Sequence, residues 1–290
     1  METQEMPIYK KPIFWQITAT GLAVLVLLGC LLAIFISLLL SKPQEEPPET
    51  EPSTVATMPP PETNPYDTMD FAIGENGYLT CVSGESMLGI DVSYAQQDID
   101  WAQVKAAGIE FAIIRVAGRG WGSEGKLYFD DYWRANYQGA KENGILVGCY
   151  FFSQATSAEE AVEEANYLLE QLDGLPMDLP IVYDWEYIDP MSVDGIPRTV
   201  GISARTVTDC TKAFCDTILA AGYETMIYFN ADQSFDLMHL EELTDYPFWL
   251  ASYSTNLNYP YKVDMWQYTE SVTVPGIEGP VDINLYLKYE

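Results

Sequence analysis

The segment that decides the fold is Leu179-Pro-Ile-Val-Tyr-Asp-Trp-Glu-Tyr-Ile-Asp-Pro190. The part up to Tyr183 is apolar and β-prone, and Pro190 closes the segment, so we predict a buried β-strand. Asp184 and Glu186 end this strand two residues apart, and side chains with that spacing point to the same face. Neighbouring carboxyls shift each other's proton affinity, which suits acid–base chemistry. A pair of solvated charges is an equally good interpretation of these two residues alone.

Strand-like and helix-like segments alternate around this segment. Predicted strands lie at 88–93, 109–117, 145–154, 179–183, 223–230, 248–254, 263–269 and 281–287; predicted helices lie at 100–107, 131–143, 157–174 and 203–221, with a short piece at 236–243. The order predicts an α/β fold, a TIM-like barrel with five β/α units followed by three β-strands. An open doubly wound sheet is the alternative. The first strand, however, lacks the glycine-rich phosphate loop that is typical of such sheets.

The N-terminal region is apolar over residues 13–40. A helix of this length spans about 42 Å, more than the ~30 Å hydrocarbon core, so we predict a single transmembrane helix. A cleaved signal peptide is the alternative, but its apolar region is usually only ~7–15 residues long. Lys10 and Lys11 precede the span and an acidic tract follows it. The positive-inside rule therefore places residues 1–12 in the cytoplasm and the rest of the chain outside the cell, attached to the cell membrane.

The remaining chain divides by composition. Residues 41–66 hold 8 of the 18 prolines and five glutamates, so we predict a disordered linker. Residues 67–87 contain three glycines and are expected to form a small hairpin or an irregular lead-in, and residues 88–290 form the barrel domain. The formal net charge of −29 argues against nucleic acid as a partner, because phosphates would be repelled.

The carboxyl ends of barrel strands meet at one mouth, and acidic and aromatic residues gather at these ends. The acids are Asp91, Asp184, Glu186 and Asp282, and the aromatic residues are Tyr150, Phe152, Tyr253, Trp266 and Tyr268. Sugars stack on aromatic rings, while carboxylates bind hydroxyls and move protons, so this combination predicts a glycan-binding mouth. Each aromatic residue taken alone is more simply explained by core packing.

The same segments carry a resemblance to a known family. The motifs are Gly89-Ile-Asp-Val-Ser93, Ile99-Asp-Trp-Ala-Gln-Val-Lys-Ala-Ala-Gly108, Phe111-Ala-Ile-Ile-Arg115, Val147-Gly-Cys-Tyr-Phe-Phe-Ser153, Asp184-Trp-Glu186, Trp249-Leu-Ala-Ser-Tyr253, Met265-Trp-Gln-Tyr268, Val274-Pro-Gly-Ile277 and Val281-Asp-Ile-Asn284. In this order they resemble the glycoside hydrolase family 25 lysozymes. The resemblance implies cleavage of the β-1,4 bond between N-acetylmuramic acid and N-acetylglucosamine in peptidoglycan strands.

The resemblance also implies roles for single residues. Asp184 and Glu186 match the family's catalytic Asp-x-Glu, and Asp91 and Asp282 match its further aspartates. Arg115 belongs to a matching motif, and we expect it to support the site. Phe151 stands where many relatives carry histidine, which would change a contact to the sugar.

For the mechanism, we expect Glu186 to be the general acid and Asp184 to assist the substrate's own 2-acetamido group as nucleophile. In the competing version Asp184 is a covalent nucleophile. That version requires the two carboxyls to lie about 5–5.5 Å apart across the scissile bond.

Other chemistry has little support in the sequence. His239 is the sole histidine, so a histidine triad or a zinc site is not expected, and we predict neither a metal nor a cofactor. Cys81, Cys149, Cys210 and Cys215 follow the apolar span, and their pairing stays open. The alternative function is a catalytically silent module that binds cell-wall glycan near the membrane. The oligomeric state, the stem-peptide and acetylation preferences, and the choice between own-wall remodelling and attack on other cells also stay open.

Overall fold

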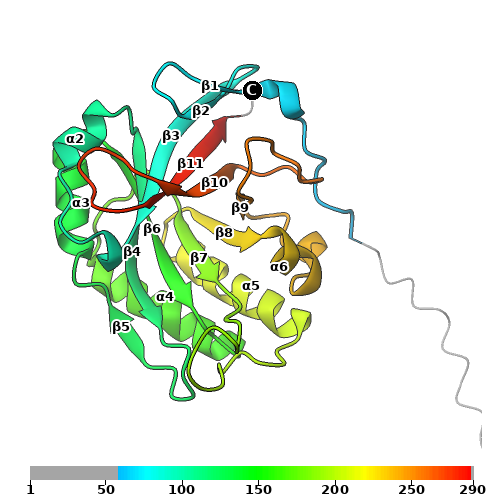
Figure 1. Cartoon of the computed structure of the whole chain (residues 1–290). Coiled ribbons are helices and arrows are strands. Elements are labelled where there is room, and N and C mark those ends of the chain that lie inside the picture. Colours follow the sequence, from blue (N-terminus) through cyan, green and yellow to red (C-terminus); the bar gives the residue numbers. More distant parts are fainter. Residues whose placement is uncertain (1–57, 289–290) are drawn as a thin grey trace, which may run out of the picture. The chain divides into compact units, whose positions relative to one another are not determined.

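A computed structural model describes residues 58–288, in which eight strands close into a barrel (Figure 1). The strands of the sheet are β3 (Glu85–Val92), β4 (Phe111–Arg119), β5 (Leu127–Phe129), β6 (Leu146–Ser153), β7 (Ile181–Trp185), β8 (Thr225–Asn230), β9 (Phe248–Ala251), β10 (Met265–Val272) and β11 (Val281–Lys288). Their order is β3-β11-β10-β9-β8-β7-β6-β4, and pairing of β3 with β4 closes the ring while β5 extends it outside. The predicted eight-stranded α/β barrel is confirmed.

Helices cover only part of this barrel. They are α2 (Trp101–Ala106), α3 (Trp133–Glu142), α4 (Ala158–Leu172), α5 (Ala204–Ala220) and the short α6 (Ala231–Asp236). No helix lies between β9 and β11 in the described chain, as the spacing of the last three strands predicts. The short helical piece expected at 236–243 is present as a 3-10 helix, Leu240–Glu242. The sequence analysis missed α6, which begins at residue 231 because the Asn230 side chain accepts a hydrogen bond from the Gln233 N–H and caps the helix there.

Two of the predicted helices begin at a serine that caps them. Ser157 accepts a hydrogen bond from the Glu160 N–H and starts α4, and Ser203 does the same for α5. The Glu160 carboxylate accepts from the Thr156 N–H at 2.8 Å, so it does not close a capping box on Ser157.

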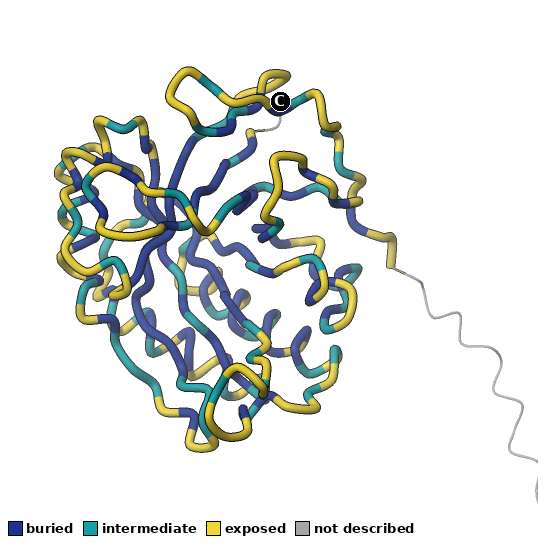
Figure 2. The backbone as a smooth tube through the Cα atoms, viewed as in Figure 1, coloured by how far each residue is buried: buried dark blue, intermediate teal, exposed yellow. Residues whose placement is uncertain are grey.

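The barrel has an inner and an outer core because successive side chains on a strand face opposite sides. Phe111, Val182, Met226, Trp249 and Met265 are among the side chains that fill the inside. The outer core lies under the helices, and the barrel strands are largely buried while the connecting loops are exposed (Figure 2). Gly89 faces inward, where a Cβ atom would lie 2.3 Å from the Phe111 ring, so the tight interior requires glycine at this position.

A small hairpin covers strands that have no helix. It consists of β1 (Phe71–Ile73) and β2 (Leu79–Cys81), which pair antiparallel. The Phe71 ring packs edge-on against Trp266 at 5.1 Å between centroids, and the Leu79 N–H donates to the Tyr268 hydroxyl at 3.2 Å. The hairpin therefore protects the outer face of β10 in place of a helix.

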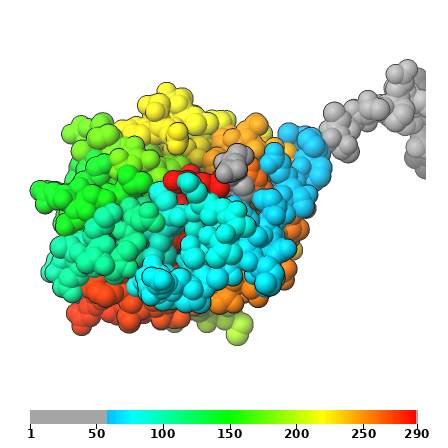
Figure 3. Space-filling view, turned by 90° about the horizontal axis from the view of Figure 1, so that it is seen from above, coloured from blue at the N-terminus to red at the C-terminus, as the bar shows by residue number. Residues whose placement is uncertain are grey.

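The chain enters the domain along the β9–β10 connection. Thr63 forms a β-bridge with Tyr261, Asn64 Nδ2 donates to the Tyr259 carbonyl at 3.0 Å, and Glu62 pairs with Lys262 at 3.2 Å. Figure 3, seen from above, shows this segment in blue on the molecular surface. The last residues of the linker predicted over 41–66 therefore pair with the barrel, while residues 41–57 lie outside the described residues.

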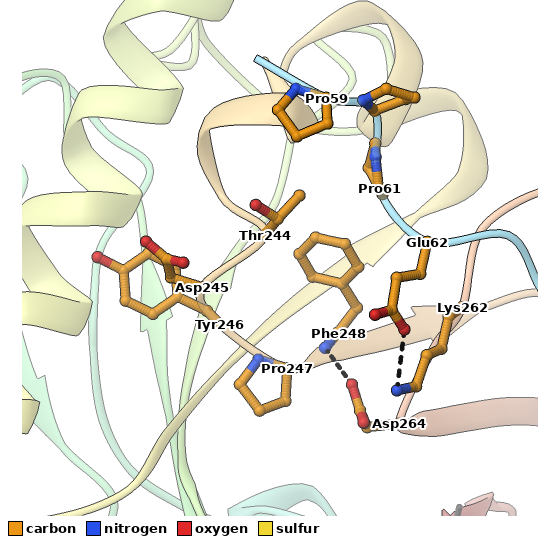
Figure 4. A pocket seen from close by; sticks show the side chains of 11 residues that line it. Pro59, Pro61, Glu62, Thr244, Asp245, Tyr246, Pro247, Phe248, Lys262 and Asp264 are labelled. Atoms are coloured by element: carbon orange, nitrogen blue, oxygen red, sulfur yellow. Dashed lines mark hydrogen bonds and ion pairs between the residues drawn. The ribbon is translucent and has the colours of Figure 1, made fainter.

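A cavity of about 530 Å³ lies where this segment meets the start of β9 (Figure 4). Pro59, Pro61, Phe248 and Asp264 are among its lining residues, and the Phe248 N–H donates to Asp264 at 3.1 Å. Because β9 begins here, the cavity lies at the end of the barrel opposite the carboxyl ends of the parallel strands.

Within residues 58–288 the structure has no apolar helix long enough to span a membrane. The span predicted at residues 13–40 and the tail predicted at 1–12 lie outside the described residues.

Candidate active site

Acidic and aromatic side chains meet in a cavity of about 280 Å³ at the carboxyl ends of the parallel strands. The lining residues are Asp91, Tyr150, Asp184, Glu186, Tyr228, Trp249, Tyr253, Gln267, Glu270 and Asp282. The four acids singled out in the sequence therefore come together.

Asp184 lies on β7, and Glu186 is the first residue after the end of this strand. Trp185 between them turns outward and donates from its indole nitrogen to the Ala155 carbonyl at 3.0 Å. Gln154 Nε2 donates to the Glu186 carbonyl at 2.6 Å, and the Gln233 side-chain amide donates to the Trp185 carbonyl. These bonds fix the backbone at the end of β7, so both carboxyls face the cavity.

Asp184 and Glu186 share a hydrogen bond, and both have raised pKa values. Burial raises the pKa of Asp184 well above its usual value, and the Glu186 charge adds to this. Burial also raises the pKa of Glu186, the hydrogen bond with Asp184 lowers it, and the Asp91 charge raises it. Burial and the mutual repulsion of two charges therefore favour the state in which the pair keeps one proton. The charge that raises the Glu186 pKa is therefore that of Asp91 on β3.

Asp91 and Asp282 form a second carboxyl pair. They lie opposite each other in the antiparallel pairing of β3 with β11. Burial, the Asp91 charge and then the Glu270 charge raise the pKa of Asp282 to about 8. Burial raises the pKa of Asp91, while hydrogen bonds from Asn284, Gln267 and Asp282 lower it. Asp282 therefore donates its proton to an Asp91 carboxylate.

The predicted position of Asp282 is correct, but the reason given for it is wrong. We expected Asp282 at the carboxyl end of the last strand. Strand β11 runs antiparallel to both β10 and β3, so its beginning, not its end, lies at the mouth. Asp282 is the second residue of β11 and reaches the cavity from there.

Gln267 joins several groups of the cavity. Its Nε2 donates to Asp91 Oδ2 at 2.8 Å, and its Oε1 accepts from the hydroxyls of Tyr228 at 3.0 Å and Tyr253 at 3.1 Å. Asn284 Nδ2 also donates to Asp91 Oδ2, at 2.8 Å, and its Oδ1 accepts from the Trp249 indole at 2.9 Å. Asp91 is therefore held by two amides that are themselves fixed.

Arg115 is buried beside the cavity on β4. Its Nε donates to Asp130 Oδ2 at 2.9 Å, and its guanidinium lies over the Tyr94 ring at 4.7 Å. Its charge lowers the pKa of Asp184, against the larger effect of burial. Arg115 thus supports the site electrostatically, and Asp130 orients it.

The structure divides the predicted aromatic residues into two groups. Tyr150 and Tyr253 line the cavity, and Phe152 pairs in register with Asp184 on the neighbouring strand. Trp266 and Tyr268 do not line it: they lie in the outer core, where their rings contact each other at 5.8 Å. Their placement at the mouth was wrong because Gln267, between them, faces inward and the side chains alternate.

Phe151 also lies outside the cavity. Its side chain is fully buried and packs against Phe214 of α5 at 6.2 Å between centroids. The contact to the sugar expected to change at this position is therefore absent. The four described cysteines are likewise buried, and they form no disulfide.

Sequence reasoning missed the polar partners Gln267 and Asn284 and the rim residue Glu270. A signal for Asn284 was present, because it follows Asp282 by two residues and so shares its face. Glu270 had no such signal, since register shifts between β10 and β11 interrupt the alternation there.

Comparison with known proteins agrees with this geometry. Residues 90–277 match the model of the glycosyl hydrolases family 25. The chain belongs to this family. The domain is therefore a glycoside hydrolase, and the resemblance inferred from the sequence is confirmed.

Relatives of the family 25 domain extend the comparison. The autolytic lysozyme of Clostridium acetobutylicum is 27% identical over 199 residues, covering 68% of this chain and 55% of that protein. Lysozyme M1 of Streptomyces globisporus is 30% identical over 213 residues, covering 68% and 67%. The crystal structure of a bacterial lysozyme from Streptomyces coelicolor superimposes with a TM-score of 0.55 at 29% identity, covering 71% of this chain and 93% of that one.

Proposed function

We propose that the protein is a muramidase that hydrolyses the β-1,4 bond between N-acetylmuramic acid and N-acetylglucosamine in peptidoglycan. The observation that carries the proposal is the convergence of Asp91, Asp184, Glu186 and Asp282 in one cavity. Membership in family 25 and the lysozymes among its relatives support the choice of substrate. A silent glycan-binding module, the alternative, would have no use for a shared proton between two buried carboxyls.

The first step uses the proton that Asp184 and Glu186 share. Asp184 Oδ1 is buried and accepts no hydrogen bond in the described structure. When the substrate's acetamido N–H donates to this oxygen, Asp184 is favoured as a carboxylate and the proton moves to Glu186. Glu186 then protonates the leaving sugar oxygen while the acetamido oxygen attacks the anomeric carbon, so the glycosidic bond breaks and an oxazolinium ion forms.

In the second step, water attacks the anomeric carbon and gives a proton to Glu186, which regenerates the acid and the acetamido group. Asp184 stabilises the oxazolinium N–H in between. Asp91 keeps its negative charge and raises the Glu186 pKa, so that Glu186 can hold a proton. Asp184 and Glu186 both come from the end of β7, which favours this route over a covalent Asp184 intermediate, because in that route the two carboxyls would flank the scissile bond at about 5–5.5 Å.

The test is hydrolysis of purified cell walls by the full chain in detergent, with analysis of the new reducing ends. New muramic acid reducing ends are expected, and Glu186→Gln should lower turnover by at least about 10²-fold while wall binding is retained. Glu224→Gln, an exposed residue next to the start of β8, is the matched control. No reducing ends with the wild type, or a fully active Glu186→Gln, would reject the proposal.

We also propose that residues 13–40 anchor the protein in the cell membrane, with residues 1–12 cytoplasmic and the glycosidase domain extracellular. The lysines before the span and the acidic tract after it support this orientation. Single cysteines introduced at Thr3 and Thr57 test it by labelling intact cells with a membrane-impermeant reagent. We expect labelling at position 57 alone. Labelling at position 3 alone would show that the topology is the reverse of the one proposed.

A further inference from the structure

Glu270 is a fifth carboxyl at the mouth. It lies near the end of β10, is exposed and lines the cavity together with the four other acids. Within residues 58–288 its carboxylate takes part in neither a hydrogen bond nor an ion pair. No described group neutralises the Glu270 carboxylate, so its negative charge acts on the cavity and on the surrounding solvent.

In the described part of the chain, no lysine or arginine lines the cavity to balance these acids, and Arg115 beside it is already paired with Asp130. The lining residues are acids, tyrosines, a tryptophan and a glutamine. The charges of Asp91 and Glu270 act together on Asp282, where with burial they raise the pKa to about 8. Asp184, only 5% exposed, contributes an oxygen without a hydrogen-bond partner. The mouth thus combines negative potential with an unused acceptor.

We propose that this mouth prefers glycan strands whose glucosamine residues carry an unacetylated amine. The inference rests on the muramidase function proposed above and names its substrate class. A protonated sugar amine at this mouth is attracted by the charges of Glu270 and Asp91, whereas a neutral acetamido group is not. One added charge pair at this degree of exposure corresponds to about a three- to tenfold gain in affinity at low salt.

The mechanism decides which sugar can carry the amine. The muramic acid residue must keep its acetyl group, because that group's oxygen attacks the anomeric carbon and its N–H donates to Asp184. The glucosamine residue takes no part in bond formation. The preference therefore applies to the glucosamine, and removing the acetyl group from the muramic acid should abolish turnover instead of increasing it.

Binding is measured first, because it does not depend on hydrolysis. The full chain in uncharged detergent is titrated at pH 6 with hexamers of glucosamine and of N-acetylglucosamine, at low salt and at about 0.3 M salt. We expect the glucosamine hexamer to bind about three- to tenfold more tightly at low salt, and salt should remove most of this difference. Glu270→Gln should reduce the preference, and the control Glu224→Gln, the same charge change away from the mouth, should keep it.

Turnover is measured next, on walls whose glucosamine residues have been enzymatically deacetylated and on the same walls after chemical re-acetylation. Faster hydrolysis of the deacetylated walls, reduced in Glu270→Gln, is expected. Equal binding of both hexamers, or a preference that Glu270→Gln leaves unchanged, overturns the inference even if both walls are cleaved. If the binding preference holds while neither wall is cleaved, the muramidase function fails and the recognition of the amine stands.

Discussion

The two carboxyl pairs at the mouth differ in how their oxygens are held. Asp184 and Glu186 come from the end of one parallel strand, and Asp184 Oδ1 has no hydrogen-bond donor in the described structure. Asp91 and Asp282 come from two antiparallel strands, and Gln267 and Asn284 both donate to Asp91. Both pairs are buried enough to raise their pKa values.

This difference separates reacting groups from groups that shape their surroundings. A carboxyl whose oxygen is left open in a cavity can bind substrate and exchange protons at that oxygen. A carboxyl saturated by fixed amides keeps its charge and position through the reaction. We therefore infer that the first pair performs the chemistry, while the second maintains the negative charge that holds a proton on the first.

The strongest test compares Asp184→Asn with Asp91→Asn. We expect Asp184→Asn to lower turnover by roughly 10²–10⁴-fold with little loss of stability, because the variant removes a buried acid that has no donor of its own. Asp91→Asn should lower turnover less and stability more, since the donors of Gln267 and Asn284 then meet a neutral amide oxygen instead of a carboxylate oxygen. Wall hydrolysis and thermal unfolding of both variants measure this. Equal losses of turnover and of stability in the two variants would remove the distinction between the pairs.

Gln267→Leu should disturb the second pair without touching its carboxyls. The Tyr228 hydroxyl then loses its acceptor, and Asp91 Oδ2 loses one of its two amide donors. These losses cost about 1–3 kcal/mol of unfolding free energy. The lost hydrogen bond normally lowers the Asp91 pKa, so the acid limb of the pH–rate profile should move to higher pH. Gln138→Leu, an exposed change on α3, is the control. A loss of stability with an unmoved acid limb would make Gln267 a purely structural residue.

The sequence was sufficient for the elements with a clear period and caps. The apolar run before Asp184 and the two-residue spacing to Glu186 correctly placed both acids on one face of a buried strand. Ser157 and Ser203 marked the starts of α4 and α5 through the hydrogen bonds that now cap them. Local chemistry decides these features, so a local pattern can predict them.

The errors arose where a pattern allowed two faces or two directions. The alternation of Trp266, Gln267 and Tyr268 shows that Gln267 lies on the opposite face of the strand from the two aromatic residues. It does not show which of the two faces points into the barrel. The direction of β11 had a better signal: the eight residues between β10 and β11 are too few for the crossover that a parallel strand requires. The burial of Trp266 and Tyr268 depends on a tertiary contact, because the β1–β2 hairpin covers the outer face of β10, which would otherwise be exposed.

The pH dependence of stability provides a smaller, graded test of the second pair. Asp282 has a pKa of about 8 in the folded protein against an ordinary value of 3.8. Between these values the folded chain keeps a proton that the unfolded chain has lost, so the free energy of unfolding falls as pH rises. Asp282→Asn removes this contribution and should make the decline between about pH 5 and pH 8 shallower. Denaturant unfolding at several pH values measures it, and an unchanged slope would mean that Asp282 ionises at its ordinary pH.

The smallest expected effect concerns the outer face of β10, opposite the mouth. Tyr268→Phe keeps the ring that packs against Trp266 and removes the hydroxyl that accepts from the Leu79 N–H. We expect a loss of about 0.5–1.5 kcal/mol in unfolding free energy, because one buried hydrogen bond disappears. Turnover on walls should be unchanged, since the ring lies in the outer core and Gln267 alone faces the cavity. Tyr253→Phe is the contrasting variant: it removes a hydroxyl that donates to Gln267 at the mouth, so it should affect turnover more than stability. A turnover defect in Tyr268→Phe as large as that in Tyr253→Phe would show that the outer face of β10 acts on the site after all.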